Sequence, residues 1–251
     1  MNNLKKTLIV GLPIVVLSAC GGNDSADRLD IADPVVRFVH ASPLAPNLTL
    51  YRNDIGRADV NNVAYKTVSN YSFIDSGSAL WQLRTTIANL VVGNVTIDPN
   101  RGNRYTIIAF PSISADTTLY TIQDPYNKSV TSDQAKVRIV NGSINANSID
   151  LYITPPGTDI SAAGVTPSIA NTSYKTAGPA SGNDSLNLDG GNYQISITVA
   201  GTKSILFKGF VSIEKNKDIL LLTLPDTILP AAIKTLIKVD GDAGAKELQA
   251  S

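Results

Sequence analysis

The sequence predicts an all-β protein with two tandem, antiparallel β-sandwich modules behind a signal peptide and a flexible tether. Three observations support this prediction. Short blocks rich in Val, Ile, Leu, Thr and Tyr alternate apolar and polar residues, which is typical of strands. The same series of blocks occurs twice. No stretch shows a convincing helical period.

Residues 1–19 have the composition of a secretory signal peptide. Lys5 and Lys6 give the segment a positive start, and residues 7–19 form an apolar stretch. That stretch is too short to cross a bilayer as a helix, which takes about 20 apolar residues. We therefore expect residues 1–19 to be removed during export.

The leader ends in Leu17-Ser18-Ala19-Cys20, which resembles a bacterial lipobox. The resemblance implies cleavage between Ala19 and Cys20, with diacylglycerol added to the Cys20 sulfur and an acyl chain such as palmitate to its new amino group. Cys20 is the only cysteine, so it has no intramolecular disulfide partner. Several acyl chains anchor firmly, because each buried methylene contributes about 0.8 kcal/mol. The alternative is an ordinary signal peptide that happens to contain a cysteine.

Residues 20–33 are expected to form the lipidated cysteine and a flexible tether. Residues 21–27 are small, polar and acidic, and cannot bury a core. The tether can reach roughly 45 Å, which would hold the body clear of the headgroups. Gly21 stands where Gram-negative sorting signals for the inner membrane carry Asp, so it favours the outer membrane in a Gram-negative source.

An internal repeat defines the two modules. Residues 36–42 (VRFVHAS) match residues 137–143 (VRIVNGS), and residues 48–51 match 149–152 at the same offset. The matches that follow in the same order are 65–67 with 174–176, 81–83 with 193–195, 105–108 with 219–222 and 119–122 with 236–239. Six matches in one order indicate a duplicated module of about a hundred residues.

Each module is predicted to be an immunoglobulin-like sandwich, because its short strands are separated by Gly, Asn, Asp and Pro. We expect module one over residues 34–128, module two over 135–240 and a flexible tail over 241–251. Residues 231–238 could form a helical turn or two, but their match to residues 119–122 favours a strand.

The segment Val36–Pro46, followed by Leu48–Tyr51, resembles the opening signature of the bacterial domain of unknown function 4397 family. The resemblance implies a secreted or lipidated envelope protein with β-sandwich modules, often in tandem, and it implies no activity. The second copy departs from the signature, with Asn141 in place of His40 and Ile144–Ala146 in place of the Pro-rich turn.

His40 is the only histidine, and with Ser42 it could form a base and nucleophile pair. The repeat provides an internal test of this idea. Asn141 in the second copy cannot act as a base, although it can still donate and accept hydrogen bonds. A hydrogen-bonding role at a strand end is therefore favoured, and we expect no catalytic residue.

Other chemical signatures are also absent from the sequence. It has no Gly-x-Ser-x-Gly elbow, no His and Cys cluster for zinc, and no Walker or dinucleotide loop. Asp240-Gly241-Asp242 is too short for a calcium loop and is predicted to be a solvated turn. We expect no metal and no cofactor. The chain has 21 basic and 21 acidic residues and no basic run, which argues against nucleic acid as a partner.

The tyrosines divide into two groups. Tyr51 with Tyr152, and Tyr65 with Tyr174, recur in both copies, which favours a packing role. Three tyrosines without an aromatic counterpart are better candidates for an exposed contact with a sugar or a protein. They are Tyr71, Tyr120 and Tyr126.

Three functional hypotheses follow. The leading one is a lipid-anchored cell-envelope protein with a non-catalytic binding or structural role, attached to a membrane and directed at an envelope protein or a glycan. The rival is an envelope hydrolase that uses a carboxylate pair on glycan or peptidoglycan, which requires a cleft with two acids about 5 to 9.5 Å apart. The third is ligand capture between the modules, where pockets often form.

Overall fold

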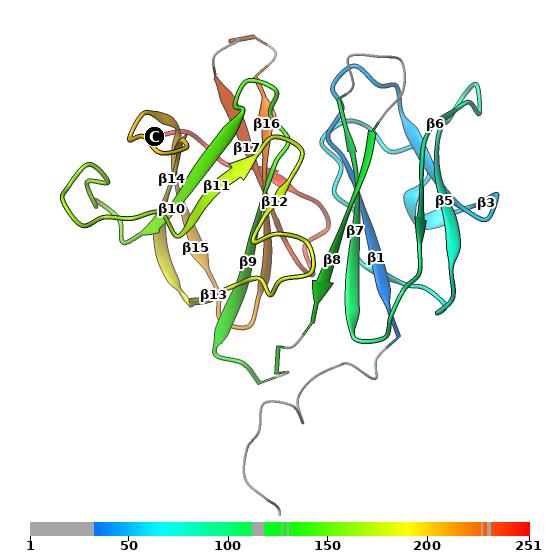
Figure 1. The fold of residues 1–251 in the computed structure, drawn as a ribbon, viewed down its shortest axis with the longest axis horizontal. Coiled ribbons are helices and arrows are strands. Elements are labelled where there is room, and N and C mark those ends of the chain that lie inside the picture. Colours follow the sequence, from blue (N-terminus) through cyan, green and yellow to red (C-terminus); the bar gives the residue numbers. More distant parts are fainter. Residues whose placement is uncertain (1–32, 112–117, 127, 130, 227, 230–231) are drawn as a thin grey trace, which may run out of the picture.

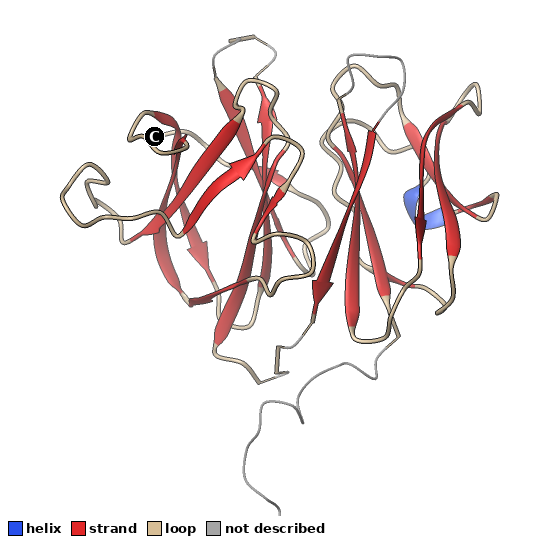
Figure 2. Cartoon of the chain, in the orientation of Figure 1, coloured by secondary structure: helices blue, strands red, loops and turns tan. Residues whose placement is uncertain are grey.

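The computed structural model describes residues 33–251 except 112–117, 127, 130, 227 and 230–231. The predicted signal peptide, its cleavage site at Ala19 and Cys20, and the tether up to residue 32 lie outside the described residues. The described chain is nearly all β, as predicted, with one 3₁₀ turn, η2 (Ala58–Val60) (Figure 2). Within the described residues, no helix is long and apolar enough to span a membrane.

The first half of the body, residues 33–126, folds as two facing sheets (Figure 1). Its strands are β1 (Val35–His40), β2 (Leu48–Arg52), β3 (Ile55–Gly56), β4 (Ser72–Phe73), β5 (Ala79–Thr85), β6 (Val91–Ile97), β7 (Asn103–Phe110) and β8 (Thr118–Pro125). One sheet has the order β4-β1-β7-β8, and the other has the order β3-β2-β5-β6. The long alternating segments predicted as strands therefore supply both layers.

The second half, residues 132–251, repeats this arrangement. Its strands are β9 (Gln134–Asn141), β10 (Ser148–Thr154), β11 (Ile169–Ser173), β12 (Ala177–Gly178), β13 (Leu186–Asp189), β14 (Gly191–Val199), β15 (Ile205–Ile213), β16 (Asp218–Pro225), β17 (Ile233–Val239) and β18 (Lys246–Glu247). One sheet has the order β12-β9-β16-β17-β18, with β13 also beside β9, and the other has the order β11-β10-β14-β15. Residues 233–239 form a strand, as their match to residues 119–122 predicted.

Most neighbouring strands run antiparallel, as expected, but one pair in each half is parallel. These pairs are β1 with β7 and β9 with β16. In each half the chain leaves the first sheet, builds most of the second and returns to lie beside its own first strand. This long excursion is the crossover that a parallel pair requires.

Strand pairing relates the two halves position by position. Val36 pairs with Tyr105, and Val137 pairs with Ile219, which agrees with the match of residues 105–108 to 219–222. The last strands align one residue away from the sequence match, so that Ile122 corresponds to Lys238.

A second difference in alignment concerns the middle strands. Arg52 pairs with Trp81 and Ile153 pairs with Ile195, so the structural counterpart of Trp81 is Ile195 and not Tyr193. A shift by two residues leaves every side chain on the same face of a strand. Sequence similarity between short alternating strands therefore does not distinguish these two registers.

Three apolar cores hold the body together. One lies between the two sheets of each half, and the third contains residues of both halves. The third core includes Val39, Ile108, Phe110 and Ile122 from the first half and Val140, Leu220, Leu222 and Leu236 from the second. The outward faces of the β1-β7-β8 and β9-β16-β17 layers are thus packed together, and four sheets follow one another across the molecule (Figure 1).

The segment 241–251 differs from the flexible tail expected from its composition. Its strand β18 pairs with β17, and the backbone N–H of Ser251 donates to the Lys208 carbonyl on β15 at 2.9 Å. Strands β15 and β17 each offer unpaired backbone groups at a sheet edge, and the final segment satisfies some of these groups.

Candidate functional site at the junction of the halves

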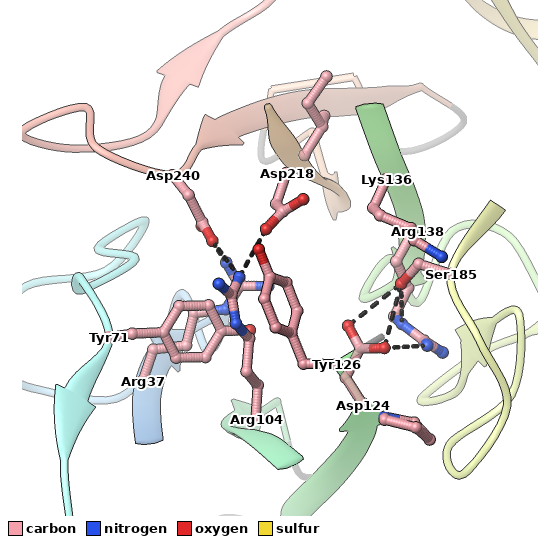
Figure 3. A pocket seen from close by; sticks show the side chains of 12 residues that line it. Arg37, Tyr71, Arg104, Asp124, Tyr126, Lys136, Arg138, Ser185, Asp218 and Asp240 are labelled. Atoms are coloured by element: carbon pink, nitrogen blue, oxygen red, sulfur yellow. Dashed lines mark hydrogen bonds and ion pairs between the residues drawn. The ribbon is translucent and has the colours of Figure 1, made fainter. Parts of the chain in front are cut away.

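Polar side chains gather at one end of the third core, where β1, β7 and β8 face β9, β16 and β17 (Figure 3). We call this group the junction cluster. Its members are Arg37, Tyr71, Arg104, Asp124, Tyr126, Arg138, Ser185, Asp218 and Asp240. Charged side chains placed between two packed sheets must be paired, because burying an isolated charge is costly.

Two arginines from the repeated Val-Arg motif cross the junction in opposite directions. Arg37 Nη1 lies 3.2 Å from Asp240 Oδ1, and Arg138 Nη2 lies 2.9 Å from Asp124 Oδ1. Both arginines are buried. Each half thus contributes one arginine from its first strand and one aspartate at the end of β8 or β17, and the two ion pairs are reciprocal.

Arg104 lies at the centre of the cluster. Its Nη1 is 2.6 Å from Asp218 Oδ2 and 2.8 Å from Asp240 Oδ2. On its other side Asp218 accepts from Lys128 Nζ at 2.6 Å. Burial works against the charge on Arg104, but Asp218, Tyr126 and Asp240 raise its pKa above the ordinary value. The guanidinium therefore stays charged and binds both carboxylates.

Two aromatic rings pack on these guanidinium groups. Arg104 Cζ lies 3.4 Å from the ring centroid of Tyr126 and 5.1 Å from that of Tyr71, and Arg37 Cζ lies 4.4 Å from that of Tyr71. Burial raises the pKa of both tyrosines, so their hydroxyls stay neutral. Tyr71 and Tyr126 are half-buried packing partners of the cluster, and Tyr120 packs beside Phe110 in the third core.

The junction cluster leaves little space for a ligand. The cavity between its side chains measures about 20 Å³, which is room for roughly one water molecule. Asp218 and Asp240 bind the same guanidinium nitrogen, so they lie as close together as a glycosidase pair would require. Both are paired with cations, however, since they share Arg104 and also bind Lys128 and Arg37 respectively, and no sugar fits between them. This site does not support the carboxylate hydrolase.

His40 is fully buried at the end of β1. Its Nε2 lies 3.1 Å from the Pro46 carbonyl oxygen, and the backbone N–H of Ser42 donates to its Nδ1 at 3.4 Å. The contact with Ser42 therefore involves the backbone and not the hydroxyl. Burial lowers the pKa of His40 below its ordinary value, against a smaller opposing effect of the Pro46 carbonyl. The neutral ring thus joins a strand end to the turn that follows.

Asn141 performs the same task at the end of β9. Its Nδ2 donates to the Ala146 carbonyl at 2.9 Å, and its Oδ1 accepts from the backbone N–H of Ser143 at 3.3 Å. Histidine and asparagine are thus exchangeable here because each can bond the following turn through one nitrogen and accept the backbone N–H two residues on. The geometry agrees with the hydrogen-bonding role expected from the repeat.

A hollow opens beside the junction cluster and has a volume of about 300 Å³. We call it the aromatic hollow. It is lined by Asp33, Val35, Tyr71, Phe73, Gly102, Asn103, Arg104 and Tyr126. Phe73 is 75 % exposed. A larger groove of about 500 Å³ lies between residues 59–72 and 243–245, and its wall is more polar.

The sequence predictions for charged sites can now be compared with the geometry. Among the described residues, no three His, Cys, Asp or Glu side chains gather in a way that could hold a metal. Residues 240–242 do form a turn, as predicted, but Asp240 is not simply solvated, because its carboxylate pairs with Arg37, 203 residues away in the chain. An arginine that recurs inside an apolar strand at positions 37 and 138 was the one signal of a buried ionic junction.

With the geometry described, the chain can be compared with known proteins. Residues 34–152 match the family described as Domain of unknown function (DUF4397). The DUF4397 match spans the first half and the first two strands of the second, and it supports the family resemblance of the opening motif. No curated protein matches.

Among the solved structures that the chain resembles is the carbohydrate-binding module CBMbc (family CBM26) of Eubacterium rectale Amy13K, in complex with maltoheptaose. Its sequence is 10 % identical, and the alignment covers 87 % of this chain and 97 % of that chain, with a TM-score of 0.23. A likeness at that level supports no conclusion about fold or ligand.

Proposed function

We propose that this protein is a lipid-anchored cell-envelope protein with a non-catalytic binding or structural role, in which both sandwiches act as one body. The observation that carries the proposal is the junction. An apolar core is shared by the two halves, and every cation of the cluster there is engaged by a carboxylate or a carbonyl. Such an arrangement stabilises a fixed geometry and leaves no group at the junction ready to react.

The aromatic hollow is the place on this body that we expect a partner to use. Its volume of about 300 Å³ is at the lower end of the range of ligand sites. Tyr71, Phe73 and Tyr126 line it, and aromatic rings bind both sugar faces and apolar side chains of proteins. An envelope glycan or an envelope protein is therefore the proposed partner.

The proposed anchor is lipid on Cys20, and the proposed membrane is the outer one if the source is Gram-negative. The support is the lipobox-like Leu17–Cys20 and the Gly21 that follows it. Asp33 also lines the aromatic hollow, so the chain from the anchor enters the body beside the proposed partner site.

The anchor is tested with the Cys20→Ser variant. We expect the natural chain to incorporate labelled palmitate and to stay with the membranes, and the variant to lose the label and appear in the soluble fraction. The matched control is Ser25→Ala, which changes the tether but not the lipidated residue. A Cys20→Ser protein that stays membrane-bound after a high-salt wash would overturn the anchor.

The binding role is tested on intact cells by protease shaving followed by cross-linking and pull-down. We expect Phe73→Ser to reduce the recovered partner severalfold. The matched control Leu229→Ser changes a side chain that is 60 % exposed in the β16–β17 connection, outside the hollow, and should leave recovery unchanged. Equal recovery with both variants would remove the hollow from the proposal. Turnover of a hydrolase substrate that is abolished by Asp218→Asn would favour the hydrolase instead.

A further inference from the structure

We propose that the junction is a pseudo-two-fold interface with a charge code, by which we mean that the charges at and beside its axis differ between the two halves. Each half therefore binds the other half and repels a copy of itself. A second copy of the chain can then bind through this surface only crosswise, its first half on the second half of the other copy. This inference depends on the junction alone and does not require the proposed envelope role.

The registers place Arg104 and Asp218 at the same position of the two halves. Arg104 directly precedes Tyr105, which pairs with Val36, and Asp218 directly precedes Ile219, which pairs with Val137. The two side chains are in contact at 2.6 Å. A residue that touches its own counterpart lies on the two-fold axis of an isologous interface. The axis position is therefore positive in one half and negative in the other.

The reciprocal ion pairs do not select a partner. Arg37 has the counterpart Arg138, and Asp240 has the counterpart Asp124. If a first half met another first half, Arg37 would still find an aspartate at the same place. These pairs therefore position the sheets equally well in like and unlike pairings, and specificity must come from elsewhere.

The charges at the axis position, in contrast, distinguish like pairs of halves from unlike pairs. Two first halves would bring Arg104 against Arg104, and two second halves would bring Asp218 against Asp218. In the folded chain these side chains are only 20 % and 14 % exposed, so solvent would screen the repulsion poorly. A repulsive contact of this kind is how interfaces commonly exclude a wrong partner.

Lys238 adds an independent contribution to the same code. It takes the place of Ile122, is 1 % exposed and donates from Nζ to Asn70 Oδ1 at 2.7 Å across the junction. The counterpart of Asn70 is Pro179, whose side chain accepts no hydrogen bond. In a pair of two second halves Lys238 would keep the Asp242 carbonyl of its own half but lose Asn70, its acceptor across the junction. A buried cation that loses an acceptor is destabilising.

The first test measures stability with the variants Arg104→Met, Asp218→Met and the double variant in the full body, residues 21–251. Arg104→Met leaves Asp218 with Lys128 and Asp240 with Arg37, and Asp218→Met leaves Arg104 with Asp240 as its carboxylate partner. Each single variant thus removes one charge from a balanced buried group and should lower the melting temperature by roughly 5 to 10 °C. The double variant removes both charges and should recover at least half of that loss. The control pair Lys215→Met and Asp133→Met, 67 % and 83 % exposed, should move it by about 1 °C or less. Additive losses in the double variant would overturn the pairing on the axis.

The second test measures partner choice directly. A protease site inserted between Ser132 and Asp133 lets the folded chain be cut, and the two pieces should remain together. After partial unfolding, dilution and cross-linking, the natural sequence should give only pairs of one first and one second half. With Arg104→Met, pairs of two first halves should appear at a level at least tenfold above the natural background.

Two results would contradict the code. Abundant pairs of two first halves from the natural sequence would show that Arg104 excludes nothing. An Arg104→Met body that keeps its unlike pairing but forms no like pairs would show that selection lies at another position. Pairs of two second halves should stay rare with Asp218→Met until Lys238→Ile is added, which separates the two contributions.

Discussion

The two halves of this protein share their strand order but differ in what covers their outer sheets. In the second half, the connection of residues 155–168 bonds to the outer side of β14, where Gln194 Nε2 donates to the Thr158 carbonyl and Gln194 Oε1 accepts from the Gly157 N–H. Gln194 and Ser196 are buried as a result. In the first half, Leu80 and Asn94 on the corresponding face are exposed. The two halves thus have the same strand order, but only in the second half does a connecting segment cover the outer sheet.

The inner faces differ in another way. There the ion pairs are symmetric, with an arginine from each half crossing to an aspartate of the other. The differences at the axis and beside it are single residues, and the second half also has the strand β18 at the edge of its inner sheet. A packed interface tolerates a change of charge only where a partner changes with it, whereas a solvated sheet face accepts a whole new segment.

The largest expected effect separates the two reciprocal arginines. Arg138 donates to the Pro179, Ala180 and Asn183 carbonyls as well as to Asp124, whereas Arg37 has Thr106 and Asp240. Arg138→Met should cost about 3 to 5 kcal/mol of unfolding free energy, because several buried acceptors lose their donor. Arg37→Met should lower the unfolding free energy by about 2 kcal/mol less than Arg138→Met does. Urea titration measures both, and equal losses would mean that the loop carbonyls contribute little.

A smaller effect compares the segments that follow β2 and β10, which are β3 in the first half and the covering connection in the second. Ile160, in the covering connection, is 4 % exposed, and Ile55 is 74 % exposed. Ile160→Ala should destabilise the body by about 2 kcal/mol or more, because it opens a cavity under the cover. Ile55→Ala should change stability by about 0.5 kcal/mol or less. Thermal unfolding checks both, and a neutral Ile160→Ala would mean that the connection is not packed on the sheet.

The smallest effect concerns the two strand ends, where His40 follows the same pattern at the end of β1 as Asn141 does at the end of β9. Because burial lowers the pKa of His40 below 6.5, the unfolded chain binds the proton first, and stability is lost as the pH falls below 6.5. His40→Asn should therefore weaken the loss of stability between pH 7.5 and 5.5 by about 1 kcal/mol. Tyr65→Phe, which keeps the histidine, should retain the full dependence. Identical pH profiles for His40→Asn and the natural protein would contradict this account.

Much of the fold could be predicted because its signals are local. Alternation with a period of two in segments such as Gln194–Val199 identifies strands, and the recurrence of residues 36–42 at 137–143 identifies a second copy. The exchange of His40 for Asn141 argued correctly for a hydrogen-bonding strand end. The sequence match did not predict the register of the middle strands correctly. Trp81 matched Tyr193 in sequence, but its counterpart in the sheet is Ile195.

The junction cluster could not be predicted, because its contacts join positions that no local pattern relates. Asp240 appeared to be part of a solvated turn, yet its partners are Arg37 and Arg104. Tyr71 and Tyr126 stood out only because they lacked a counterpart, and they pack on those guanidinium groups. The recurring arginine was visible, but its partner was not.

The sequence by itself determined that this is a duplicated all-β chain, because strand periodicity and a repeat are properties of neighbouring residues. The lipobox-like motif likewise predicts an anchor at Cys20 from four consecutive residues. Only the tertiary structure decided that the two copies share a core and meet at Arg104 and Asp218. That decision depends on which faces of two sheets pack together, and packing between distant segments is set by the summed burial and charge pairing of the whole chain.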